Sequence, residues 1–176
     1  MKLDADIRAQ LEQYLQLMEG DVVIKVSAGS DDVSRDMLDL LEELTSMSSR
    51  ITTEQAQLDR TPSFSVNRPG EDTGIVFAGV PLGHEFTSLV LALLQVSGRA
   101  PKADEKVISR IKQLKGEYRF ETYVSLSCHN CPDVVQALNM MSVLNPGISH
   151  TMIDGAAYKA EVESKDILAV PTVYLN

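Results

Sequence analysis

Two cysteines separated by two residues are the part of this sequence best suited to chemistry. Cys128 and Cys131 are the only cysteines among the 176 residues, and they enclose His129 and Asn130. They follow a strand-like segment that ends at Leu126 and precede a segment with the apolar spacing of a helix. At a helix N-terminus, free backbone N–H groups and the helix dipole stabilise a thiolate. This placement predicts thiol–disulfide exchange.

The order of the two cysteines predicts their roles. Cys128 is nearer the loop, so we expect it to be more exposed and to act as the nucleophile. Cys131, one helical turn further on, is then the resolving thiol that releases a mixed disulfide. Pro132 fits the first turn, where its missing N–H costs no intrahelical hydrogen bond. His129 places a potentially cationic ring beside the sulfur, where it either favours the thiolate or is simply solvated.

Two other interpretations of the cysteine pair stay open at this stage. A zinc site needs two further ligands, and neither His84 nor His150 shows a ligand spacing, so no metal ligands are predicted. An inert pair buried in a core is the second alternative, although inert cysteines have no reason to begin a helix. Pro171 is a further candidate, because a proline that opens a strand lies at a sheet edge or beside a site. The sequence alone does not decide whether its peptide bond is cis.

The elements that must position these residues alternate between helices and strands. Apolar stripes at helical spacing predict helices over 4–18, 32–47, 83–97, 104–114 and 130–144. Strand-like patterns cover 21–28, 50–56, 63–67, 74–80, 118–126 and 148–154. Asp4 is the expected N-cap of the first helix. Such alternation predicts an α/β fold with βαβ units and a mixed sheet.

The same order of elements occurs twice along the chain. In the first unit, residues 1–100, a helix, strand, helix and strand lead to Pro62, which opens another strand. The second unit, residues 101–176, repeats this order up to Pro171, and we interpret the pattern as a tandem repeat. The second unit then lacks the last strand and helix of the first. That last helix, 83–97, is apolar nearly all round, which predicts burial at a seam between units or inside a single core.

Composition and charge exclude several classes of function. Hydrophobic residues make up 44% of the chain and charged residues 23%, as in an ordinary folded protein. The net charge of −9 argues against nucleic-acid binding, which needs clustered lysines and arginines. The basic stretch 99–119 is either a solvated helix face or a docking patch for an acidic partner. With no apolar run long enough for a membrane and no secretory signal, we expect a cytoplasmic protein, where a purely structural disulfide is rare.

Four longer segments carry a resemblance to a known family. They are YVSLSCHNCPDVVQAL, MMSVLNPGISHTMIDG, VPTVYLN and FAGVPLGHEFTSLVLALLQ. These segments are similar to the N-terminal domain of the flavoprotein component of alkyl hydroperoxide reductase. The resemblance covers nearly the whole chain, weakly before about residue 60.

This resemblance implies a fold and a set of site residues. The fold is two fused thioredoxin-like units, the first a structural or docking unit without cysteines and the second the redox unit. Cys128 and Cys131 are implied to be the redox pair, and Pro171 the cis-proline that faces them. Glu85 is implied to lie near the dithiol. There a carboxylate with a raised pKa would shuttle the proton of the resolving thiol, unless it only stabilises the start of its own helix.

The implied function is that of the thiol–disulfide oxidoreductase domain of an NADH-dependent peroxiredoxin reductase. Electrons pass from a FAD- and NADH-binding disulfide reductase domain, through the dithiol, to the disulfide of a two-cysteine peroxiredoxin that reduces peroxides. The chain has no G-x-G-x-x-G fingerprint, so neither cofactor is expected within it. Two alternatives are a general disulfide oxidoreductase with a less reducing potential, and a docking module whose cysteines set its oxidation state.

Overall fold

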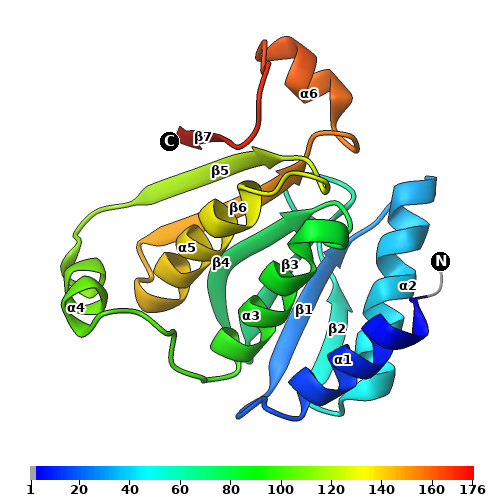
Figure 1. The fold of residues 1–176 in the computed structure, drawn as a ribbon, viewed down its shortest axis with the longest axis horizontal. Coiled ribbons are helices and arrows are strands. Elements are labelled where there is room, and N and C mark those ends of the chain that lie inside the picture. Colours follow the sequence, from blue (N-terminus) through cyan, green and yellow to red (C-terminus); the bar gives the residue numbers. More distant parts are fainter. Residues whose placement is uncertain (1–2) are drawn as a thin grey trace.

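The computed structural model describes residues 3–176, which form one mixed sheet with helices on both faces (Figure 1). The strands are β1 (Val22–Ser27), β2 (Ile51–Gln55), β3 (Ser63–Arg68), β4 (Glu71–Ala78), β5 (Tyr118–Val124), β6 (Ile148–Asp154) and β7 (Thr172–Leu175). The helices are α1 (Ala5–Leu15), α2 (Asp32–Met47), the 3-10 turn η1 (Gly83–Glu85), α3 (Phe86–Val96), α4 (Glu105–Gln113), α5 (Cys131–Leu144) and α6 (Lys159–Ser164).

The sheet has seven strands in the order β2-β1-β3-β4-β6-β5-β7. On one side, β1 and β2 are parallel and linked by α2, and β3 pairs antiparallel with β1. On the other side, β5 and β6 are parallel and linked by α5, and β7 pairs antiparallel with β5. The two sides meet where β4 and β6 pair in parallel. The predicted helix–strand alternation and mixed sheet are therefore confirmed.

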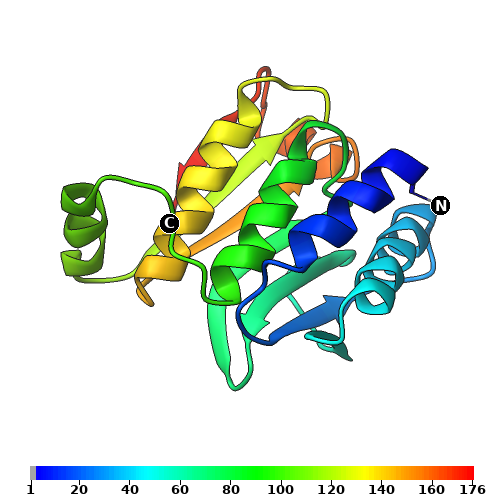
Figure 2. The same ribbon diagram turned by 60° about the horizontal axis from the view of Figure 1, so that its bottom comes forward.

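One face of the sheet carries the helices that build the main core. In Figure 2, α1, α3 and α5 lie side by side across this face, with α3 in the middle. α3 buries seven of its residues, namely Ser88, Leu89, Val90, Ala92, Leu93, Leu94 and Val96. The predicted burial of this helix on several sides is confirmed, because α1 covers one flank and α5 covers the other.

The opposite face is covered in part by a helix that the sequence did not predict. α6 and the residues around it pack on Ala78, Tyr123 and Ile153, which form a cluster separate from the main core. Val124 belongs to the main core, so the alternation of side chains along β5 places Tyr123 on the other face. α6 has six residues, KAEVES, and such a short polar segment shows no apolar stripe.

Most predicted boundaries hold to within a few residues. α2 and β6 have the predicted bounds, and Asp4 caps α1 by accepting a hydrogen bond from the Asp6 N–H at 2.7 Å. The larger corrections are that α1 ends at Leu15 and not at 18, β4 starts and ends earlier than 74–80, β5 ends at Val124, and 83–97 begins with the turn η1. In α4 the expected apolar stripe buries only one residue fully, and Leu114 beyond it is exposed. No helix among residues 3–176 is long and apolar enough to cross a bilayer.

Candidate active site

The two cysteines lie where β5 ends and the chain turns into α5. They form a disulfide with their Cα atoms 5.5 Å apart. Cys131 is the first residue of α5 and is fully buried, whereas Cys128 lies in the preceding turn and is half-buried. Cys128 is therefore the more exposed of the two, as its position in the sequence predicts.

The start of α5 is arranged to hold negative charge on Cys128. The backbone N–H of Cys131 donates a hydrogen bond to the Cys128 sulfur, with an N···S distance of 3.2 Å. Pro132 occupies the first turn, where it removes no intrahelical hydrogen bond. After reduction, the same N–H group and the helix dipole would stabilise a thiolate on Cys128.

A cis-proline segment forms another wall of the site. The peptide bond between Val170 and Pro171 is cis, which the sequence alone did not decide. The carbonyl oxygen of Val170 lies 3.9 Å from the Cys128 sulfur. Pro171 directly precedes β7, the partner of β5, so sheet pairing brings the proline beside the cysteine turn.

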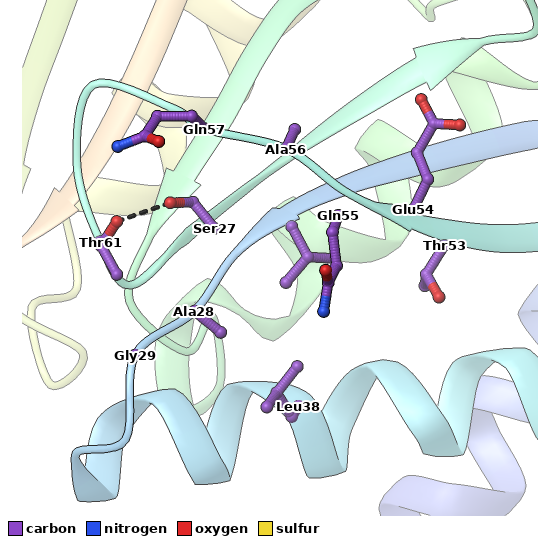
Figure 3. A pocket seen from close by; sticks show the side chains of 11 residues that line it. Ser27, Ala28, Gly29, Leu38, Thr53, Glu54, Gln55, Ala56, Gln57 and Thr61 are labelled. Carbon is purple, nitrogen blue, oxygen red and sulfur yellow. Dashed lines mark hydrogen bonds between the residues drawn. The ribbon is translucent and has the colours of Figure 1, made fainter.

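A second cis-proline marks the equivalent turn in the cysteine-free part of the chain. The bond between Thr61 and Pro62 is cis, and Pro62 directly precedes β3, the antiparallel partner of β1. Ser27 and Thr61 lie with their hydroxyl oxygens 2.5 Å apart at the mouth of a pocket of about 640 Å³ between α2 and β2 (Figure 3). The side chains that meet here, Ser27 and Thr61, carry hydroxyl groups and no sulfur. They cannot take part in disulfide exchange. The proline pattern in the sequence had marked this place, although not its cis bond.

The turn before α3 is joined directly to the cysteine turn. The backbone N–H of His84 donates a hydrogen bond to the carbonyl oxygen of Leu126 at 2.9 Å. Gly83 makes this approach feasible, because a Cβ there would lie 2.7 Å from the same oxygen and its φ of +58° disfavours other residues. The segment GHEF and the cysteine motif therefore share one surface, although they are far apart in sequence.

Glu85 lies fully buried in this contact region. Its Oε1 accepts a hydrogen bond from Ser88 Oγ at 2.6 Å, and Ser88 Oγ accepts one from Gln136 Nε2 of α5 at 3.2 Å. Glu85 Oε2 has no partner among the described residues. Burial raises the pKa of Glu85, and the hydrogen bond from Ser88 opposes this only in part. The side chain makes no capping hydrogen bond to α3.

The structure brings one histidine to the motif and keeps another away. The rings of His84 and His129 are in edge-on contact, with centroids 4.4 Å apart, so the sequence distance of His84 was misleading. His150 is fully buried between Thr122 and Asn139, each 2.7 Å from a ring nitrogen. Among residues 3–176, no group of three or more histidine, cysteine, aspartate or glutamate side chains is arranged to hold a metal ion.

Similar sequences come from bacterial proteins that are much longer. No model of a protein family matches the chain. The chain is 78% identical over 176 residues to a Ferdinandcohnia aciditolerans protein named NADH dehydrogenase, covering all of the chain and 34% of that protein. It is 60% identical over 174 residues to the F subunit of alkyl hydroperoxide reductase of Staphylococcus aureus, covering 99% of the chain and 34% of the relative. The chain thus spans about a third of the length of the curated relatives it matches.

Solved structures with the same fold include one from an alkyl hydroperoxide reductase. The NTD_N/C domain of AhpF from Enterococcus faecalis matches with a TM-score of 0.90 and 28% identity, over 99% of this chain and 91% of that one. A protein disulfide oxidoreductase from Aeropyrum pernix matches with a TM-score of 0.85 and 20% identity, over 100% and 85% of the two chains. At that identity, the second match shows the fold alone, which is thioredoxin-like.

Proposed function

We propose that this chain, which matches the N-terminal part of the F subunit of alkyl hydroperoxide reductase, is a dithiol relay in peroxide reduction. One observation carries the proposal: a disulfide at the start of α5 whose outer sulfur, that of Cys128, faces a cis-proline segment. A disulfide held this way is accessible at one sulfur and protected at the other, as a relay of electron pairs requires.

In the proposed reaction, two electrons and two protons pass through the cysteine pair. The reduced Cys128 thiolate attacks the disulfide of a two-cysteine peroxiredoxin and forms a mixed disulfide, releasing one partner thiolate. Cys131 then attacks Cys128, which closes the internal disulfide and releases the second partner thiolate. A flavoprotein disulfide reductase domain, supplied by a part of the longer protein that this chain does not cover, would reduce Cys128–Cys131 again. FAD and NADH would bind in that part.

Glu85 is the proposed proton carrier for the resolving step. Cys131 must lose a proton before it attacks, and in its buried position it has no direct access to water. Glu85 is also buried, belongs to the turn that contacts α5, and has one carboxyl oxygen without a partner among the described residues. A carboxyl group whose pKa is raised by burial suits proton transfer near neutral pH.

His129 and Pro171 are proposed to act on Cys128. A protonated His129, beside the sulfur in sequence, would favour the thiolate. The His129 side chain is exposed, and its ring contacts that of His84. Pro171, which has no backbone N–H, would keep the Val170 carbonyl beside the Cys128 sulfur. A partner chain must approach the sulfur on this surface. We propose that partners dock on this surface, around the Cys128 turn and the turn before Pro171.

We interpret the fold as two units, residues 1–100 and residues 101–176. The support is the order of pairing around each cis-proline, which is the same for Pro62 and Pro171. In the first unit β4 pairs with β3 and is followed by α3, whereas β7 is an edge strand among the described residues. The first unit would serve as a scaffold and docking surface.

Trapping of the mixed disulfide tests the proposal. Cys131→Ser should hold a covalent adduct between Cys128 and an oxidised two-cysteine peroxiredoxin, because the resolving thiol is absent. The same variant should give little adduct with scrambled ribonuclease, and Cys128→Ser should give none with either. Equal adducts with both substrates would indicate a general disulfide oxidoreductase. No adduct with either would leave only a docking role and refute the relay.

A further inference from the structure

Arg60, from the cysteine-free unit, binds two carboxylates of the redox unit. Its Nε and Nη2 donate to the two carboxylate oxygens of Glu161 at 2.7 and 3.0 Å. Nη2 also lies 2.7 Å from Glu121 Oε2. The hydroxyl of Tyr123 donates to the same Glu161 carboxylate at 2.6 Å. The Arg60 side chain is only 15% exposed, so solvent screens this group less than a surface ion pair.

A second hydrogen bond ties the same helix to the same loop. The hydroxyl of Tyr158, directly before α6, donates to the carbonyl oxygen of Pro62 at 2.6 Å. Arg60 and Pro62 belong to one loop, and Tyr158 and Glu161 belong to one end of α6. α6 is therefore fastened to the other unit at two points.

These contacts matter because α6 has little else to hold it. None of its six residues is fully buried, and none of the residues from 165 to 171 is either. Half-buried side chains near α6, such as Val162 and Ile167, pack on the small cluster around Tyr123. The polar contacts of Arg60 thus supply a large part of the attachment of α6.

The segment after α6 leads directly to the reactive sulfur. The N–H of Ile167 bonds back to the carbonyl oxygen of Val162 in α6 at 3.1 Å, which couples the segment to the helix. Three residues later the chain reaches Val170, whose carbonyl oxygen lies 3.9 Å from Cys128 Sγ. A shift of α6 would therefore move the wall beside Cys128.

We propose that Arg60 is a positioning residue that holds the cis-Pro171 segment against Cys128. The functional part of this inference rests on the proposed relay, in which a partner chain lies on that segment. Without the guanidinium, the carboxylates of Glu121 and Glu161 lose the cation they share and repel each other, although Glu161 keeps its hydrogen bond from Tyr123. The segment then loosens. Exchange with a protein disulfide slows, while a small disulfide, which needs only an accessible sulfur, still reacts.

Hydrogen exchange on the 176-residue chain tests the structural part without any partner. In Arg60→Gln, amides of residues 159–170 should exchange about tenfold faster than in the wild type, because a shielded charge pair is broken. Arg60→Lys should lie between the two, since it keeps the charge but loses the planar fork. Arg50→Gln is the matched control: it removes an exposed arginine that pairs with Asp21 at 3.5 Å. Unchanged exchange in Arg60→Gln would overturn the proposal.

A ratio of two rates tests the functional part. The reduced variants react with an oxidised two-cysteine peroxiredoxin and, separately, with the small disulfide 5,5′-dithiobis(2-nitrobenzoic acid). Arg60→Gln should lower the ratio of the first rate to the second about tenfold, and Glu161→Gln should lower it in the same direction. An equal loss of both rates would mean a purely structural role and overturn the inference. A wild-type chain inert toward the peroxiredoxin would refute the relay, while hydrogen exchange would still decide the role of Arg60.

Discussion

Cys128 has a hydrogen-bond donor on one side and an acceptor on the other. The backbone N–H of Cys131 points at its sulfur, and the carbonyl oxygen of Val170 lies 3.9 Å away. In the reduced protein the N–H group favours the thiolate, whereas the carbonyl can accept a hydrogen bond from the neutral thiol. Cys131 is buried and has no comparable exposure. The two thiols should therefore differ strongly in reactivity.

Alkylation of the reduced chain checks this difference. We expect iodoacetamide to modify Cys128 at least about tenfold faster than Cys131 at pH 7, because helix-start thiolates form at lower pH than the ordinary thiol pKa of about 8.5. Peptide mapping after short reaction times measures both rates. Equal rates, or a faster reaction at Cys131, would contradict the assigned roles.

Glu85 gives the next prediction at the residue scale. Glu85→Gln keeps the shape of the side chain but cannot accept the proton of Cys131, so release of the mixed disulfide should slow by about 10²-fold near pH 7. The initial attack by Cys128 should be nearly unchanged. Rapid-quench experiments measure the rates of attack and of release separately. Glu12→Gln, at an exposed position, is the control. An unchanged release step would rule out proton transfer by Glu85.

The raised pKa of Glu85 also affects stability. A carboxyl group whose pKa is higher in the folded chain than the usual 4.5 favours folding below that pH, and this contribution is lost as pH rises through the folded pKa. Glu85→Gln should therefore gain stability relative to the wild type between pH 4 and pH 7.5. Urea unfolding of both proteins at pH 4 and at pH 7.5 measures this gain in stability. A constant difference between the two proteins would show that Glu85 ionises normally.

At the scale of elements, the contact between η1 and the β5–α5 turn depends on one glycine. Gly83→Ala would place a Cβ 2.7 Å from the Leu126 oxygen at a φ of +58°. We expect a loss of about 1–3 kcal/mol in the free energy of unfolding. Gly70→Ala is the control, because Gly70 also has a positive φ, +74°, but nothing within 4 Å. Equal losses in both variants would mean that backbone strain alone, and not the close approach, makes Gly83 necessary.

A buried polar network links β5, β6 and α5 below the cysteines. The oxygen of Asn139 can only accept, so His150 Nδ1 carries the hydrogen and Nε2 accepts from Thr122. Burial lowers the pKa of His150 to about 3, below its ordinary value of 6.5. The unfolded chain therefore binds a proton at higher pH than the folded one. Stability should fall as pH drops from 6.5 toward 3, by up to about 1.4 kcal/mol per unit.

His150→Gln should remove this part of the pH dependence. The variant will be less stable at neutral pH because it disturbs a buried network. Its stability should nevertheless change less between pH 7 and pH 5 than that of the wild type. His84→Gln, which removes an exposed histidine, should keep the wild-type slope. Urea unfolding at several pH values measures the slopes, and identical slopes in all three proteins would contradict the assignment.

Elements with long apolar stripes could be predicted from the sequence, and those with few apolar residues could not. α2 has sixteen residues with a clear stripe, and its predicted bounds were right. α6 is too short and polar to show one, although its Glu161 binds Arg60 of the loop before β3. The apolar stripe predicted the helix α4 itself, but Ile111 is its one fully buried residue. Packing of such a helix depends on distant elements that local spacing does not reveal.

Only those parts of the site that are close together in the sequence could be predicted from local patterns. Local placement at a helix start identified Cys128 and Cys131. The prediction that Glu85 lies near the dithiol came from a family resemblance, and the contact between His84 and His129 was missed. Both depend on the pairing of β4 with β6, a parallel contact between segments about 75 residues apart, which no periodicity in the sequence encodes.

At the scale of the whole molecule, both parts of the chain build the site. Residues 101–176 supply the cysteines and the cis-proline segment. Residues 3–100 supply the GHEF turn on one side and Arg60, which binds Glu161 of α6, on the other. One continuous sheet holds these contributions in place. The redox motif therefore depends on residues from the other part, and we expect the two parts to work together as one unit.

The most direct test of the relay is rapid mixing of the reduced chain with an oxidised bacterial two-cysteine peroxiredoxin. Stopped-flow measurement should show fast, stoichiometric reduction of the peroxiredoxin disulfide, because Cys128 is accessible and Cys131 can resolve the intermediate. Cys128→Ser should abolish the reaction while leaving binding of the partner intact. A wild-type rate no better than that of dithiothreitol would contradict the proposed relay.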